Sequence, residues 1–285
     1  MNLFVFPNLG KSGTRGCLQA LAMRCGHMPF ELLLEEKFIG EFPEIEASYG
    51  KFSEQMEACH FVVAIGGDGT ILQAVKASLP YAKPVLGINT GRLGFLSSME
   101  VDELDQIGRL LTGQYALEER MLLEVETRNG GQTARSIAFN DAAVMRGGAS
   151  KVIDVSITCD GKPVGGYTAD GVVFSTPSGS TAYALSAGGP IVDPALFAIE
   201  VTPLCAHSLF ARSILFSSEK RLCVTVPRAD AERSAYLAID GDRAVQLTPA
   251  AEVWISAAAQ RARLVNLEGR SFYEVLDKKI LSKNF

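Results

Sequence analysis

VVAIGGDGTIL, residues 62–72, decides the fold of the first part of this chain. The apolar residues predict a buried strand, the GGDGT that follows predicts a tight turn, and the next apolar stripe predicts a helix over 70–78. Glycines let backbone N–H groups approach a ligand closely, and a helix begins with a partial positive charge, so this turn favours a phosphate. Asp68 is unexpected there, because a carboxylate repels phosphate. Either it caps the helix, or it faces a hydroxyl or a metal ion as a base or ligand in phosphoryl transfer.

Strand and helix patterns alternate on both sides of this turn. The segments NLFVFP, FELLLE, FVVAI and PVLGIN predict strands. Helices are predicted over 14–25 and over about 101–112, the second capped by Ser98 and closed by Gly113. Such alternation is typical of a parallel sheet with helices on its faces. We therefore predict a Rossmann-like α/β domain over residues 1–115.

From about residue 116 the apolar residues recur with period two. The segments LLEVETR, VIDVSITC, LCVTVP and EVWISA alternate in this way, and NGG at 129–131 predicts a hairpin turn. This pattern is typical of antiparallel sheets, so we predict a β-sandwich-like domain over 116–267. The charged segment 268–285 is predicted to be helical and to pack back on the first domain.

Composition argues against several classes of protein. The 285 residues suffice for one large domain or two ordinary ones, and 47% hydrophobic residues allow a sizeable core. A net charge of −5 argues against a nucleic-acid partner, and no apolar run is long enough to cross a membrane. The start of the chain lacks the pattern of a signal peptide, and the six cysteines lack C-x-x-C spacing. We therefore predict a cytoplasmic protein with reduced thiols and no zinc site.

A second group of polar residues lies in DGVVFSTPSGSTAYALSAGGP, residues 170–190. A predicted strand runs into a turn that is rich in hydroxyl groups and glycine. Polar groups of this density beside apolar strands suit a ligand with ribose and amide groups better than a lipid. Ordinary turn chemistry is the alternative for any single residue. The side chains expected to cluster around this turn are those of Asp170, Ser178, Thr181, Tyr183 and Ser186.

Five blocks of the sequence, taken in order, resemble the ATP-NAD kinase family. GGDGT alone is weak, because diacylglycerol kinases, sphingosine kinases and phosphofructokinases have similar turns, whereas the long fourth block is specific. The resemblance implies a two-domain phosphotransferase that uses ATP and Mg²⁺ to convert NAD to NADP at the 2′-hydroxyl of the adenosine ribose. The blocks are GGDGT at 66–70, GINTGRLGFL at 87–96, FNDAAVMRG at 139–147, DGVVFSTPSGSTAYALSAGGPIVDP at 170–194 and VTPLCAHSLFARSILF at 201–216.

The resemblance also implies roles for individual residues. Asp68 would be the base that acts on the ribose hydroxyl, and Asp170 would bind the nicotinamide end of NAD. Arg146 and Arg212 are candidate phosphate contacts, although Arg212 could instead form a surface salt bridge. No protein ligand is assigned to Mg²⁺. The residues that would contact phosphate in the turn are Gly66, Gly67, Gly69 and Thr70, and those that would hold NAD are Asn140, Asp141, Asp170, Thr181, Ala182, Tyr183 and Ser186.

Several alternatives stay open on the sequence. Thr168 stands where many family members have arginine, which leaves the choice between NAD and NADH undecided. No residue clearly reads the base of the donor, so polyphosphate is an alternative to ATP. A lipid or sugar kinase would share only the GGDGT turn, and the block at 170–194 argues against it. A nucleotide sensor without catalysis would share the fold, and the presence of Asp68 argues against it. The family implies a homodimer or homotetramer.

Overall fold

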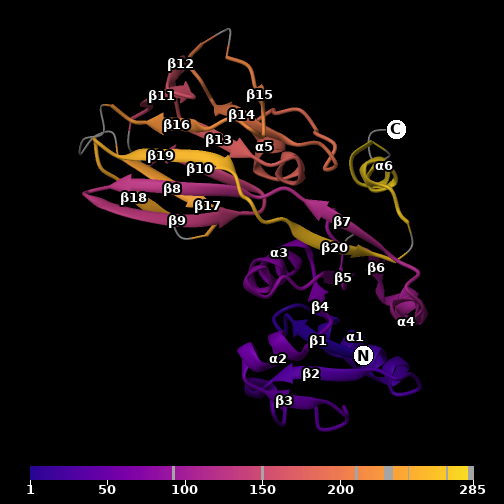
Figure 1. Cartoon of the computed structure of the whole chain (residues 1–285). Coiled ribbons are helices and arrows are strands. Elements are labelled where there is room, and N and C mark those ends of the chain that lie inside the picture. The colour runs from indigo at the N-terminus through magenta and orange to yellow at the C-terminus, as the bar shows by residue number, and fades with distance from the viewer. Residues whose placement is uncertain are drawn as a thin grey trace. The chain divides into compact units, whose positions relative to one another are not determined.

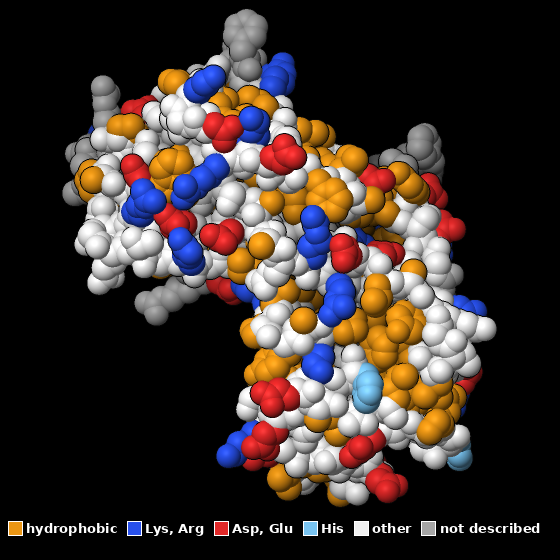
Figure 2. All heavy atoms as spheres, in the orientation of Figure 1, with side chains coloured by type: hydrophobic (Ala, Val, Ile, Leu, Met, Phe, Trp, Pro, Cys, Tyr) orange, Lys and Arg blue, Asp and Glu red, His pale blue; other side chains and the backbone are white. Residues whose placement is uncertain are grey.

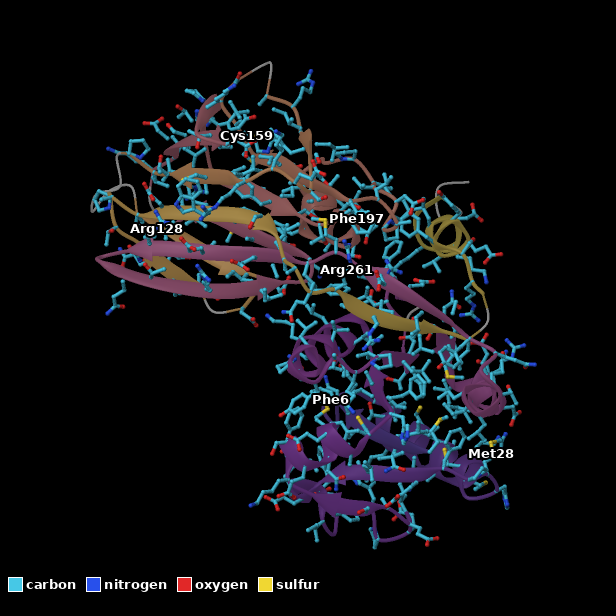
Figure 3. The ribbon with its side chains drawn as sticks, viewed as in Figure 1. Phe6, Met28, Arg128, Cys159, Phe197 and Arg261 are labelled. Carbon is cyan, nitrogen blue, oxygen red and sulfur yellow. The ribbon has the colours of Figure 1, made fainter. Side chains whose placement is uncertain are left out.

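The computed structural model describes residues 1–91, 94–148, 151–208, 211–227, 234–242, 244–267 and 269–281. The chain divides into two compact units, Met1–Glu119 with Ala262–Phe285, and Arg120–Arg261 (Figure 1). The sequence predicts boundaries after residues 115 and 267. Arg261, the last residue of the second unit, places its guanidinium 4.1 Å from the ring centre of Phe197 in the same unit (Figure 3).

The first unit is built on a mostly parallel sheet with the order β3-β2-β1-β4-β5-β20-β7, and β6 pairs with β5. The central strands β4 and β5 are buried along their whole length, as expected for strands that helices cover on both faces. Apolar side chains of the strands and of the flanking helices form one core, which includes Leu3, Leu18 and Ile65. The strands are β1 (Asn2–Pro7), β2 (Glu31–Glu35), β3 (Ser48–Gly50), β4 (Phe61–Gly66), β5 (Val85–Asn89), β6 (Met99–Glu100), β7 (Ala116–Arg120) and β20 (Ala262–Asn266).

Helices connect these strands, and most of them begin and end near their predicted positions. The predicted helix over 14–25 is confirmed as α1 (Thr14–Cys25), and the one over 70–78 begins two residues earlier, as α3 (Asp68–Ser78). The structure adds α2 (Phe52–Ala58), which the sequence does not predict. The prediction that Ser98 caps the next helix is wrong.

Glu100 takes the place that the sequence assigns to Ser98. The chain is still extended at β6, so the helix cannot begin until this short strand ends. Glu100 forms a capping box with Glu103, which satisfies the first free N–H groups. The helix starts as a 3₁₀ helix over Val101–Gly108, continues as α4 (Arg109–Thr112) and ends at Gly113 in the left-handed conformation.

The second unit is a sandwich of two antiparallel six-stranded sheets, with the orders β15-β14-β13-β10-β17-β18 and β12-β11-β16-β19-β8-β9. Inward-facing residues of both sheets form one core, in which Ile153, Val155 and Ile157 of β11 are at most 2% exposed. The predicted α/β-plus-β fold class is therefore confirmed. The strands are β8 (Leu123–Asn129), β9 (Gln132–Ala138), β10 (Asp141–Arg146), β11 (Ile153–Cys159), β12 (Lys162–Ala169), β13 (Gly171–Ser175), β14 (Ala198–Leu204), β15 (Ile214–Ser217), β16 (Leu222–Thr225), β17 (Ala235–Ile239), β18 (Val245–Leu247) and β19 (Glu252–Ala257).

The chain returns to the first unit through β20, which pairs in parallel with β5, Leu264 opposite Val85. After β20 follow α6 (Phe272–Leu276) and a π-helical turn over Asp277–Leu281. No helix of the described residues is long and apolar enough to span a membrane. On the face drawn in Figure 2, Lys and Arg side chains lie among Asp and Glu side chains.

Candidate active site

The side chain of Asp68 points away from its own helix and towards a loop of the first unit. Gly67 is the N-cap of α3, and no side chain caps this helix, so the capping alternative for Asp68 is wrong. Its Oδ2 accepts a hydrogen bond from the backbone N–H of Phe95 at 2.9 Å, and its Oδ1 accepts one from Leu96 at 3.1 Å. Two of the five blocks therefore meet at this carboxylate, which two backbone donors hold in a single orientation.

Gly94 makes this arrangement sterically possible. A Cβ atom at this position would lie 1.9 Å from Oδ1 of Asp68 and 2.6 Å from its Cγ. No side chain can be accommodated there while the carboxylate stays in place. Gly94 of the second block therefore leaves the room that the carboxylate of Asp68 in the first block occupies.

The four other residues of the turn fall into two pairs. Gly66 and Thr70 pack against each other, because a Cβ on Gly66 would lie 2.4 Å from Oγ1 of Thr70, and Asn8 donates to that hydroxyl at 3.0 Å. Gly67 and Gly69 have no described atom within 4 Å of a Cβ, and neither has a positive φ. Neither packing nor backbone conformation among the described residues therefore requires glycine at these two positions. The open space beside them leaves the N-terminus of α3 accessible to an anion.

In the second unit, a cavity of about 400 Å³ gathers several of the predicted site residues. Asp170 and Arg146 form one side of it, and their side chains are bonded, Nε to Oδ1, at 2.5 Å. Arg146 also donates to the carbonyl of Gly148 at 2.6 Å. The guanidinium of Arg146, which the sequence makes a candidate phosphate contact, thus has partners within the protein. The residues lining the cavity are Met145, Arg146, Gly148, Asp170, Tyr183, Ser186, Ala187, Leu204 and Cys205.

The segment after β13 supplies the aromatic side of this cavity. Tyr183 begins the short helix α5 (Tyr183–Ser186), is 40% exposed and places its hydroxyl 3.4 Å from the sulfur of Met145. Partial burial and then the nearby carboxylates, Asp141 first, raise the pKa of Tyr183. Thr181 donates to the carbonyl of Ser178 within its own turn, as ordinary turn chemistry predicts. Thr181 and Ala182 do not line the cavity.

Asp240 holds the Asn140-Asp141 pair in place, and the sequence did not single it out. Its carboxylate accepts hydrogen bonds from three consecutive backbone N–H groups, those of Phe139 (3.0 Å), Asn140 (2.7 Å) and Asp141 (3.1 Å). Asp240 has a φ of 51°, which Asp tolerates better than most residues. The Asp-Gly pair at 240–241 is a turn signal that could have revealed it.

The side chain of Asp141 is 6% exposed and forms no hydrogen bond with the described residues. Burial, followed by the charge of Asp240, raises the pKa of Asp141 from 3.8 to about 7. A buried carboxyl without a partner is costly unless it keeps its proton or receives a donor from a ligand. The amide of Asn140 also lacks a described hydrogen-bond partner, so both side chains are available to a ligand.

We expect the stability of the unliganded protein to fall as the pH rises from about 4 to 7, on the order of 3 kcal/mol from this one group. Between the usual value of 3.8 and the raised pKa of about 7, the folded protein keeps a proton on Asp141 that the unfolded chain has lost. Asp141→Asn should flatten this slope. Urea unfolding of both proteins at several pH values measures it, and an unchanged slope in the variant would contradict the assignment.

The remaining predicted residues have local partners. Thr168 donates to Oδ1 of Asp154 across β11 and β12 at 2.6 Å. Arg212 is exposed and donates to the carbonyl of Ala211. Among the described residues, no group of three or more His, Cys, Asp or Glu side chains is arranged to hold a metal ion.

Comparisons with known proteins give the same family for both halves of the chain. Residues 12–116 match the model of the ATP-NAD kinase N-terminal domain, and residues 139–267 match that of the ATP-NAD kinase C-terminal domain. An NAD kinase of Symbiobacterium thermophilum is 43% identical over 221 residues, 77% of each chain. An NAD kinase of Carboxydothermus hydrogenoformans is 36% identical over 259 residues, 90% of this chain and 91% of that one.

Solved structures agree at the level of the fold. A yeast NADH kinase in complex with NADH superimposes with a TM-score of 0.90 at 24% identity, covering 100% of this chain and 88% of that one. An NAD kinase from Archaeoglobus fulgidus in complex with ATP gives 0.74 at 24% identity, with 99% and 98% covered. With both family domains matched in order along the sequence, the chain belongs to the ATP-NAD kinase family.

Proposed function

We propose that this enzyme transfers the γ-phosphate of ATP to the 2′-hydroxyl of the adenosine ribose of NAD, with a divalent cation such as Mg²⁺, giving NADP and ADP. NAD kinase activity, and with it the class of phosphotransferase, follows from membership of the family and from relatives 36–43% identical over most of the chain. The finer statement rests on one observation: the carboxylate of Asp68 is held by two backbone N–H groups beside an open helix N-terminus.

Asp68 is proposed as the base. Phosphoryl transfer needs positioning and neutralisation of charge more than covalent chemistry. A ribose hydroxyl is a weak nucleophile, so a base within about 3 Å of it is the expected aid. The hydrogen bonds from Phe95 and Leu96 keep the carboxylate in one orientation and leave its remaining lone pairs for the hydroxyl proton.

The same turn is proposed to receive the phosphates of ATP. Gly67 and Gly69 flank Asp68 with open space beside them, and the first free N–H groups of α3 lie there. Thr70 contributes through its packing against Gly66, because its own hydroxyl is buried and bonded to Asn8. With no described cluster of three metal-binding side chains, Mg²⁺ is proposed to be held mainly by the substrate phosphates and water, near the single carboxylate of Asp68.

NAD is proposed to bind in the second unit. The cavity that gathers Asp170, Tyr183 and Ser186 supports this, as do the side chains of Asn140 and Asp141, which have no hydrogen-bond partner among the described residues. Thr181 and Ala182 are proposed to contact NAD from the turn that leads into α5. A cytoplasmic location and a homodimeric or homotetrameric state stay predictions.

Gly69→Ala should lower activity about tenfold or more without loss of stability. The added methyl group meets no described atom, and alanine favours a helix by about 1 kcal/mol over glycine, so the fold is kept while the methyl group obstructs the phosphate. Gly66→Ala is the matched contrast, because its methyl group would collide with Thr70 and lower the melting temperature. Steady-state kinetics and thermal unfolding of both variants distinguish the two roles. Normal KM and kcat for Gly69→Ala would place the phosphate elsewhere.

Asp170→Ala should raise the KM for NAD about tenfold and leave the KM for ATP within about twofold. The variant removes a cavity side chain and frees Arg146 from its bond. Arg146→Ala separates these two effects, because it breaks the same bond and keeps the carboxylate. An increase confined to the KM for ATP would put the NAD site elsewhere.

The direct test is product formation by the purified protein with ATP and Mg²⁺, offering NAD and NADH in parallel. An NADP-specific dehydrogenase detects the product. NADP from NAD supports the proposal, and the ratio of the two rates measures the consequence of Thr168. Polyphosphate in place of ATP tests the donor. Phosphorylation of neither dinucleotide with either donor would overturn the proposed reaction.

A further inference from the structure

A lysine from the end of the described chain reaches Asp68. The π-helical turn over Asp277–Leu281 carries Lys279, whose Nζ lies 3.4 Å from Oδ2 of Asp68. The same ammonium lies 4.3 Å from the ring centre of Phe95, the residue whose backbone N–H bonds to that oxygen. The side chains of Lys279 and Asp68 are 30% and 34% exposed, so a ligand that reaches one can reach the other.

The segment that carries Lys279 is attached to the first unit at several points. Phe272 of α6 packs on Phe95 with ring centres 6.1 Å apart. Arg270 forms an ion pair with Glu103, and Arg109 donates to the carbonyl of Leu267 at 2.6 Å. A capping box at Ser271 begins α6. The lysine is therefore presented by an ordered element, not by a free tail.

The GGDGT turn itself contains no basic residue, although it places a carboxylate where ATP phosphates are proposed to bind. A bound polyphosphate repels a carboxylate, which favours turning the side chain of Asp68 away from it. A cation paired with Asp68 opposes this displacement.

We propose that Lys279 is a positioning residue of the phosphoryl-transfer site: its ammonium pairs with Asp68 and keeps that carboxylate oriented while the polyphosphate is bound. The proposal rests on the role given to Asp68 under the proposed function. The alternative is an ordinary ion pair that attaches the C-terminal segment to the surface, which would have little effect on activity. The contact with Phe95 favours the first view, because the lysine reaches both the carboxylate and the loop that holds it.

A double-mutant cycle tests the inference with the full chain. The proteins are the wild type, Lys279→Met, Asp68→Asn and the double variant, each measured for kcat and for the KM of NAD and of ATP. Lys279→Met should lower kcat about tenfold to a hundredfold, with the KM for NAD within about twofold. In the Asp68→Asn background the same change should alter the residual rate by less than about twofold, because there is no carboxylate left to position.

Two further variants separate positioning from folding. Lys279→Arg keeps the cation and should restore kcat to within about threefold. Lys278→Met removes the neighbouring exposed lysine and should leave kcat unchanged. If Lys279→Met lowers the melting temperature, comparison with Lys279→Arg at a temperature where both are folded still measures the loss of turnover.

The possible failures are distinct. Wild-type kcat in Lys279→Met overturns the inference and leaves the base role of Asp68 intact. An equal loss in both backgrounds overturns it as well, because Lys279 would then act independently of Asp68. Normal turnover in Asp68→Asn removes the base role itself and the inference with it.

Discussion

Asp68→Asn is expected to lower kcat by about 10²–10⁴-fold while the fold and nucleotide binding are kept. The amide keeps the shape of the carboxylate and can still accept a hydrogen bond from Phe95 or Leu96, but it cannot take a proton from a ribose hydroxyl. The loss should therefore lie in kcat, and the KM values for NAD and ATP should change little.

The measurement is steady-state NADP formation, combined with thermal unfolding and with binding of each nucleotide by calorimetry. Asp154→Asn is a matched control, because it makes the same change of side chain at a carboxylate of the second unit, which bonds to Thr168. Near-normal turnover in Asp68→Asn would remove this residue from the base role.

Gly94→Ala is expected to cause a loss of comparable size, about 10²-fold or more in kcat, although residue 94 carries no chemistry of its own. The new methyl group would lie 1.9 Å from Oδ1 of Asp68, and the carboxylate must leave its two N–H donors to make room. Because the displaced atoms are the end of a side chain, the protein should stay folded while the base loses its position.

Gly91→Ala supplies the control for Gly94→Ala. It lies in the same block, and a methyl group there meets no described atom within 4 Å, so kcat should stay within about threefold of the wild type. Thermal unfolding checks that both variants are folded. If Gly94→Ala were fully active, the orientation of Asp68 by the 95–96 backbone would not matter for turnover.

Local sequence patterns are sufficient for most of the fold. Strands over NLFVFP and FVVAI, the helix over 14–25 and the hairpin at 129–131 all lie where the sequence predicts them. These patterns work because each element buries one face, and the spacing of apolar residues records which face that is. The predicted N-cap at Ser98 was wrong because the two-residue strand β6 pairs with β5. The N-cap is Glu100 instead.

The sequence alone points to part of the candidate site. Asp68 and the block at 170–194 stand out because an acid between glycines and a dense set of hydroxyl groups are unusual, and the structure gathers Asp170, Tyr183 and Ser186 at one cavity. The sequence makes Arg146 a candidate phosphate contact, and the structure adds that it pairs with Asp170. Its partner lies 24 residues away, and no local pattern records such a pairing.

The sequence by itself therefore determined the two kinds of sheet, the glycine turn and the presence of an acid in it. Only the tertiary structure decided what each acid touches: Asp68 is bonded to a loop 27 residues away and to a lysine 211 residues away, and Asp240 holds a turn 99 residues away. The spacing of apolar residues along a helix or strand shows which of its faces is buried. The partner of a charged group depends on which distant segments pack together. The residues next to that group in the sequence do not reveal this packing.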